Sequence, residues 1–119
     1  MAKKIIQQIP LSLPEVREIL EQRKEKLDAM QLRVLEYARK YSKLSPIKAK
    51  QLIEELMLKF ELNREEAVQI VDICPTNIEE LRSILSGYKR LVSFILFSED
   101  KLRAIVDLVE KYLREDMQE

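Results

Sequence analysis

Apolar residues recur along most of the chain at alternating steps of three and four, which is the spacing of an amphipathic α-helix. Charged and polar residues fill the positions between them, as on the outer faces of packed helices. The pattern predicts helices over residues 13–44, 46–60, 64–74, 78–86 and 99–114. The chain is therefore expected to be mainly α-helical, with the apolar faces of the later helices forming a bundle.

Residues suited to capping mark the boundaries of these helices. Ser12 and Asn63 each precede a helix and are followed three residues later by Glu15 and Glu66, the spacing of a reciprocal capping box. Pro75 ends the helix before it, because proline lacks a backbone donor and its ring clashes with the preceding turn. Further boundaries are predicted at Ser45-Pro46, at Thr76 or Asn77, at Ser86-Gly87 with the glycine in a positive-φ cap, and at Ser98.

The first helical region carries a long apolar seam. Its members are Leu13, Val16, Leu20, Leu27, Met30, Val34, Tyr37, Tyr41 and Leu44, with a second edge at Ile19, Leu35 and Ala38. Residues 21–26 are wholly polar, so we expect a kink or a break there, and with a break two helices. The seam is interpreted either as the face of a core helix or, in part, as a surface that faces a partner chain.

The N-terminal residues 3–11 differ from the rest of the chain. Ile5, Ile6, Ile9 and Leu11 flank two glutamines, and β-branched residues favour an extended strand. Pro10 confines such a strand to an edge or to its end. The sequence offers no clear second strand, and a single strand is unstable alone. This segment is interpreted either as a frayed tail or as a strand that adds to the sheet of another protein.

A second exceptional segment follows the predicted glycine cap. Residues 91–97 are apolar on nearly every side and rich in aromatic and β-branched residues, so periodicity cannot separate a strand from a buried helix. We predict an extended or irregular, mostly buried conformation. If the chain itself does not bury this segment, its apolar surface implies a partner.

Composition agrees with one mainly α-helical domain. The 119 residues include 46% apolar residues, enough for a core, while 35% are charged and only one is glycine. The net charge is zero, which gives no support to general polyanion binding. The charges are nevertheless uneven: residues 1–44 hold 10 Lys or Arg against 6 Asp or Glu, and residues 45–119 hold 11 against 15.

The inventory of reactive residues argues against an enzyme. The chain has no histidine and one cysteine, so histidine acid–base chemistry and thiolate metal clusters are excluded, and no cofactor or metal site is predicted. Cys74 lies on an apolar helix face, where a buried and inert thiol is expected. Glu79 and Glu80 are adjacent helix positions that point apart, so they form no carboxylate dyad. One cysteine and no secretory signal make the cytoplasm the expected compartment, and no membrane-spanning segment is predicted.

Residues 65–85 carry a resemblance to a known family. The helix ending at Cys74, the Pro75-Thr76-Asn77 corner and the following Glu79-Glu80-Leu81 resemble the core of the F subunit of archaeal RNA polymerase, counterpart of the fourth subunit of eukaryotic RNA polymerase II. The same stretch resembles the HRDC-like helical domain in that protein. The resemblance implies an N-terminal strand over 1–12, a helical region over 13–44 and an HRDC-like helical bundle over 45–119.

The resemblance also implies a function and partners. The F subunit is a non-catalytic stalk component that forms a heterodimer with the polymerase's E subunit, projects from the polymerase core, and supports promoter opening, handling of nascent RNA and processivity. RNA contact is attributed mainly to the E subunit. The partner interface implied for this chain consists of Ile5, Ile6, Ile9 and Leu11, added to the sheet of the E subunit, with Leu13, Val16 and Leu20 beside it.

Two other functions compete with this hypothesis. The same bundle could be an autonomous HRDC-type module that binds nucleic acid, with Lys89 and Arg90, next to Tyr88, as its candidate contacts. Such a module would bind RNA or DNA in a salt-dependent way. The seam from Leu13 to Leu44 could instead form a small homodimeric coiled-coil adaptor.

Overall fold

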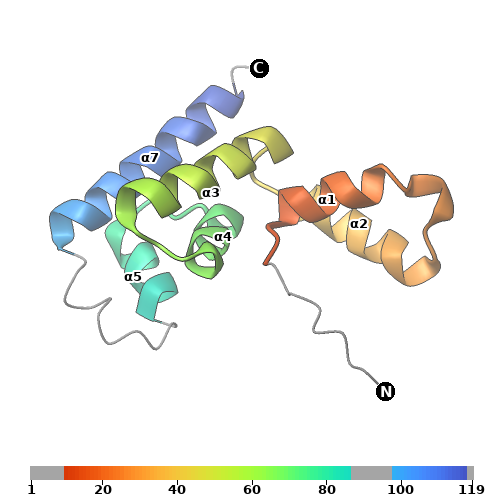
Figure 1. Cartoon of the computed structure of the whole chain (residues 1–119), viewed down its shortest axis with the longest axis horizontal. Helices are drawn as coiled ribbons and strands as arrows, with labels where there is room; N and C mark the ends of the chain where they lie inside the picture. The colour runs from red at the N-terminus through yellow and green to blue at the C-terminus, as the bar shows by residue number, and fades with distance from the viewer. Residues whose placement is uncertain (1–9, 87–97, 118–119) are drawn as a thin grey trace.

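The computed structural model describes residues 10–86 and 98–117, and every regular element in these ranges is a helix (Figure 1). The elements in chain order are α1 (Leu13–Glu21), the 3-10 helix η1 (Lys24–Lys26), α2 (Ala29–Tyr41), α3 (Pro46–Phe60), α4 (Arg64–Ile73), α5 (Ile78–Ser86) and α7 (Glu99–Met117). The mainly α-helical class is thus confirmed. The predicted N-terminal strand and the conformation predicted for residues 91–97 fall largely outside the described residues.

The predicted helix starts are confirmed by their hydrogen bonds. Ser12 and Glu15 form a reciprocal capping box at α1, and Asn63 and Glu66 form another at α4. Of the two candidates for α5, Asn77 is the cap, because its side-chain oxygen accepts the backbone N–H of Glu80 at 2.8 Å. Ser45 caps α3 and Ser98 accepts the N–H of Lys101 at α7. A further capping box, Asp28 with Gln31 at α2, was not among the predicted boundaries.

Two helices end on non-glycine residues in the left-handed conformation. Glu61 follows α3 with a φ of 56°, and Cys74 follows α4 with a φ of 51°. A side chain at this conformation costs about 1–2 kcal/mol relative to the right-handed one. Pro75 prevents α4 from continuing beyond Cys74, which confirms the predicted end of this helix. The predicted cap at Gly87 lies outside the described residues.

The core lies between α3, α4, α5 and α7, which form the bundle (Figure 1). Each helix contributes the apolar stripe that its periodicity predicts. The buried core residues on these four helices are Ala49, Leu52, Ile53, Leu56, Ala67, Val68, Ile70, Val71, Leu81, Leu85, Leu102, Ile105, Val106, Val109 and Tyr112. Cys74 belongs to the same cluster, and burial raises the pKa of its thiol to about 11. This agrees with the prediction of an inert cysteine.

Helices α1 and α2 form a hairpin beside the bundle, with its turn pointing away from it (Figure 1). The polar residues 21–26 do not continue a helix: they supply the end of α1, a turn and η1. The expected interruption is therefore a complete break. Helix α1 packs against both α2 and α3, so it lies between the second helix of the hairpin and the bundle.

A matched pair of leucines on α3 tests the position of the core. Leu52 is 0% exposed and Leu58 is 82% exposed. Leu52→Ala should lower the free energy of unfolding by about 2–5 kcal/mol, because it leaves a cavity among packed side chains. Leu58→Ala should change it by less than about 0.5 kcal/mol. Urea denaturation followed by circular dichroism measures both, and equal effects would contradict the assigned core.

Candidate functional site

The start of α1 is held against the bundle by buried polar groups. Ser12, Pro14 and Glu15 are buried, and only 6% of Glu15 is exposed. The Glu15 carboxylate accepts the backbone N–H of Ser12 at 3.0 Å and the Ser12 hydroxyl at 2.9 Å. A buried carboxylate needs such donors, because removing its charge from water is otherwise costly.

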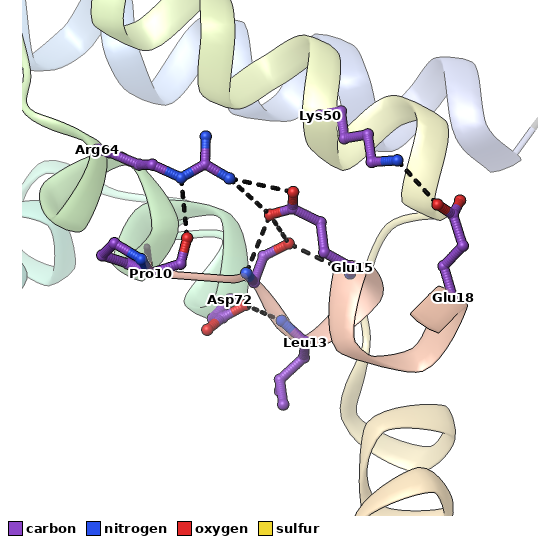
Figure 2. A network of polar contacts seen from close by, with 8 residues as sticks. Pro10, Leu13, Glu15, Glu18, Lys50, Arg64 and Asp72 are labelled. Carbon is purple, nitrogen blue, oxygen red and sulfur yellow. Dashed lines mark hydrogen bonds and ion pairs between the residues drawn. The ribbon is translucent and has the colours of Figure 1, made fainter. Parts of the chain in front are cut away.

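Arg64, the first residue of α4, supplies the opposite charge. Its Nη2 lies 3.1 Å from Oε2 of Glu15, and its Nε donates to the carbonyl oxygen of Pro10 at 2.8 Å (Figure 2). One guanidinium thus binds both the carboxylate and the backbone just before α1. Its planar arrangement of donors allows two acceptors to be bound at once. Arg64 therefore fixes Pro10 and the start of α1 against the bundle.

Asp72 of α4 makes the third connection. Its Oδ1 accepts the backbone N–H of Leu13 at 2.8 Å (Figure 2). The first N–H groups of a helix have no partner inside that helix, so a side chain from α4 satisfies one of them. Burial raises the pKa of Asp72 above its ordinary value of 3.8, and the nearby Glu15 adds to the rise, while the hydrogen bond from Leu13 opposes it. We call Pro10, Ser12, Leu13, Glu15, Arg64 and Asp72 the junction network.

Two lysine contacts border the junction network. Lys50 of α3 donates to the carboxylate of Glu18 on α1 at 2.8 Å (Figure 2). Lys43, just after α2, donates to the carbonyl oxygen of Ile73 at the end of α4 at 2.7 Å. These contacts are exposed, so each contributes little by itself. Together with the junction network, they connect both ends of the hairpin to the bundle.

The predicted interface residues fall into three groups. Leu11 is 41% exposed and immediately follows the anchored Pro10. Leu13, Val16 and Leu20 are half-buried within the chain itself. Ile5, Ile6 and Ile9, together with the candidate nucleic-acid contacts Lys89 and Arg90, lie outside the described residues. The structure therefore brings Leu11 and the first turn of α1 together at one anchored point on the surface.

The apolar seam divides between the two helices of the hairpin. Its α2 members Met30, Val34, Tyr37 and Tyr41 are all exposed, whereas Leu35 and Ala38 from the second edge are buried. Interpretation of the whole seam as a core face is therefore wrong for α2. Met30, Val34, Tyr37 and Tyr41 are absent from the predicted interface, although their 4-3-4 spacing is visible in the sequence. Spacing alone could not tell which of two adjacent apolar edges would be buried.

The structure places the acidic residues that could serve as metal ligands or as a carboxylate pair. No group of three potential metal ligands occurs among residues 10–86 and 98–117. Glu80, one of the two adjacent carboxylates, accepts hydrogen bonds from the side chains of Thr76 and Asn77 at the start of α5. Glu80 thus contributes to the N-terminal cap of α5. Within the same part of the chain, no helix combines the length and the apolar character needed to cross a bilayer.

Comparison with known proteins gives consistent matches along nearly the whole chain. The sequence model of the family described as RNA polymerase Rpb4 matches residues 10–113. The chain is also 31% identical over 115 residues to the DNA-directed RNA polymerase subunit Rpo4 of Methanocaldococcus jannaschii. That alignment covers 95% of this chain and 92% of the relative. The matched region contains the junction network, the hairpin and the bundle.

Substitution of Arg64 tests the junction network. Arg64→Ala leaves the buried carboxylate of Glu15 without its cation and should lower the free energy of unfolding by about 1.5–3 kcal/mol. Lys50→Ala is the control, because it also removes a contact between α1 and the bundle, but an exposed one worth less than about 1 kcal/mol. Urea denaturation gives both values, and amide exchange of α1 should accelerate in Arg64→Ala. Equal losses would show that the burial of Glu15 is unimportant.

The pH dependence of stability tests Asp72. Because its pKa is raised in the folded chain, that state binds the proton more tightly, and stability falls as the pH rises from 3.8 through the native pKa. The Asp72→Asn variant keeps a side-chain oxygen that can accept the backbone N–H of Leu13. It carries no charge that folding would have to remove from water. It should be more stable than wild type at pH 7, and the difference should vanish below pH 3.8.

Thermal unfolding at several pH values measures this difference, with Asp107→Asn on an exposed position of α7 as the control. A wild type that gains stability relative to Asp72→Asn as the pH rises through this window would contradict the stated direction of the shift.

Proposed function

The chain belongs to the RNA polymerase Rpb4 family, and from that premise we propose that it is the non-catalytic F subunit in the stalk of an archaeal DNA-directed RNA polymerase. Membership confirms the family resemblance carried by residues 65–85, since Rpo4 is the counterpart of the F subunit. Family membership makes the chain an accessory subunit of RNA polymerase and not the catalytic one. The absence of histidine from the whole sequence is consistent with a role in assembly.

Within the polymerase, the proposed partner is the E subunit, which we call the stalk partner. The observation that carries this proposal is the anchoring of Pro10. Arg64 holds the carbonyl of Pro10, and Leu11 is exposed directly after it. A strand formed by the residues before Pro10 would thus be attached at a defined point on the surface. This attachment lowers the conformational entropy that the strand loses when it binds the partner.

Strand addition suits the residues that precede this anchor. Ile5, Ile6 and Ile9 are strongly β-prone, and residues 10–86 and 98–117 contain no strand with which they could pair. The stalk partner would supply the sheet edge, whose unpaired backbone groups bind an added strand. Leu13, Val16 and Leu20, half-buried on α1, would form the apolar support beside that strand.

The bundle would then serve as a rigid body joined to this interface. We propose that α3, α4, α5 and α7 belong to the HRDC-like region and that the heterodimer connects to the polymerase core. Contact with nascent RNA would occur through the heterodimer, chiefly through the stalk partner. In this arrangement the chain supports promoter opening, RNA handling and processivity by holding its partner in place.

Binding to the purified stalk partner from the same source tests the proposal. The triple variant Ile5→Ser, Ile6→Ser and Ile9→Ser keeps the length of the tail and removes its apolar side chains. Even if the partner buries only two of the three isoleucine side chains, their burial contributes at least about 3 kcal/mol to the free energy of binding. The affinity of the triple variant for the stalk partner should therefore fall by about 100-fold or more. The control is Gln7→Ala with Gln8→Ala. Calorimetry gives the affinities, and hydrogen exchange should show protected amides at residues 3–9 in the wild-type complex.

Three results would contradict the proposal. The first is a chain that does not bind the stalk partner, and the second is a triple variant that binds it as tightly as wild type. The third is salt-dependent binding of RNA or DNA by the chain alone, which would favour the autonomous nucleic-acid-binding module.

A further inference from the structure

Helix α4 holds a short extended stretch of the chain at both of its ends. The side chain of Arg64, at the start of α4, binds the carbonyl oxygen of Pro10 at 2.8 Å (Figure 2). The side chain of Asp72, near the end of the same helix, binds the backbone N–H of Leu13 at 2.8 Å. Between these contacts Ser12 has an extended backbone, with a φ of −74° and a ψ of 160°. Residues 10–12 therefore run alongside α4 in a fixed direction.

Arg64 is placed against the electrostatic preference of its own helix. It is the first residue of α4, where the partial positive charge of the helix end favours acidic side chains and disfavours a cation. Glu65 and Glu66, in the same turn, follow that preference. A residue that departs from a local rule points to a function outside its own helix. Here that function lies in the two groups that the guanidinium binds, Pro10 and Glu15.

The two acceptors require the geometry of a guanidinium. Nε of Arg64 donates to the carbonyl of Pro10, while Nη2 lies 3.1 Å from Oε2 and 3.4 Å from Oε1 of Glu15. A lysine ammonium could neutralise the same carboxylate, but it is a compact point charge without a planar set of donors. The charge of Arg64 is therefore enough to pair with Glu15, whereas holding Pro10 at the same time depends on the shape of the side chain.

The group that Arg64 holds restricts the direction of the preceding chain. Pro10 has no backbone N–H, and its ring fixes φ at about −65°. With φ fixed and the carbonyl oxygen bound, little backbone rotation remains at this residue. A residue that precedes a proline also favours an extended backbone, which suits a strand formed by the residues before Pro10. One hydrogen bond to one carbonyl therefore limits the orientations open to such a strand.

We propose that Arg64 is a positioning residue for assembly: it holds Pro10 so that the N-terminal segment adds to the sheet of the stalk partner with a smaller loss of entropy. This inference rests on the proposed function and adds to it a residue that acts through Pro10. Because the same guanidinium binds Glu15 of α1, strand addition and attachment of the hairpin to the bundle are coupled. Thermodynamic linkage makes this coupling reciprocal, so binding of the partner strengthens the attachment.

A purely structural role for Arg64 makes a different prediction. If Arg64 only neutralises Glu15, another cation at this position preserves both the stability of the chain and its affinity for the stalk partner. If Arg64 positions Pro10, a lysine preserves the stability and weakens the binding. The two roles are therefore separated by one conservative substitution.

Arg64→Lys in the full chain is that substitution. It keeps a cation for Glu15, so the free energy of unfolding in urea should fall less than in Arg64→Ala. It lacks the second donor for Pro10, which should restore the freedom of about one backbone residue and weaken binding to the purified stalk partner by about 10-fold. Lys50→Arg is the matched control, because it exchanges the cation of the exposed contact with Glu18. It should bind as wild type in the same calorimetric titration.

A double-mutant cycle shows whether Arg64 acts through the N-terminal segment. In the variant Ile5→Ser, Ile6→Ser and Ile9→Ser strand addition is already lost, so Arg64→Lys should weaken its remaining binding by less than about 2-fold. Amide exchange measures the linkage. The amides of α1 should exchange more slowly in the wild-type complex than in the free chain, and Arg64→Lys should reduce this difference.

A further variant leaves the ion pair intact. Pro10→Gly keeps the carbonyl acceptor but frees φ, and it should weaken binding by about 2–5-fold. If Arg64→Lys fails to fold by circular dichroism, this variant decides alone, and wild-type affinity in Pro10→Gly would then overturn the inference.

Two other results would overturn it. If Arg64→Lys binds as tightly as wild type while the isoleucine variant does not, the proposed function stands and the positioning role is wrong. If Arg64→Lys causes the same loss with and without the isoleucines, Arg64 acts independently of the N-terminal segment. A wild-type chain that does not bind the stalk partner would instead refute the proposed function, and the inference with it.

Discussion

The burial of one carboxylate determines how the two parts of this molecule fit together. Glu15 is almost fully enclosed, and its charge is tolerable only because Ser12 and the Arg64 guanidinium donate to it. The same arginine binds the carbonyl of Pro10, and the neighbouring Asp72 binds the first amide of α1. Removing any of these groups would leave others buried without partners. The position of the hairpin relative to the bundle therefore depends on this network.

Buried and exposed apolar side chains are divided unevenly between the bundle and the hairpin. The bundle contains a continuous cluster of buried apolar residues, so it offers a stable body. On α2 the hairpin buries Leu35 and Ala38, and it leaves Met30, Val34, Tyr37 and Tyr41 exposed. The proposed role of holding a partner would draw on both properties, because a rigid body reduces the freedom lost on association. The junction network connects them through hydrogen bonds and an ion pair.

Much of the fold could be predicted because local signals agreed with the tertiary arrangement. The capping boxes at Ser12 and Asn63, the stop at Pro75 and the stripes of α3 and α7 need only neighbours in sequence. The left-handed caps at Glu61 and Cys74 could not be foreseen, since glycine is the usual residue there. The pairing of Arg64 with Glu15 also escaped prediction, because 49 residues separate the two and each is ordinary in its own helix.

The sequence by itself determined most of the helices and their starts, the family, and the unusual character of the N-terminal residues, because these depend on local composition and spacing. Only the tertiary structure decided which apolar edge of α2 is buried. Met30, Val34, Tyr37 and Tyr41 have the same helical spacing as a core stripe, yet α2 turns Leu35 and Ala38 inward instead. The reason is that a helix can bury only the face its neighbour covers, and the break at residues 21–26, with the anchoring of α1, sets where that neighbour lies.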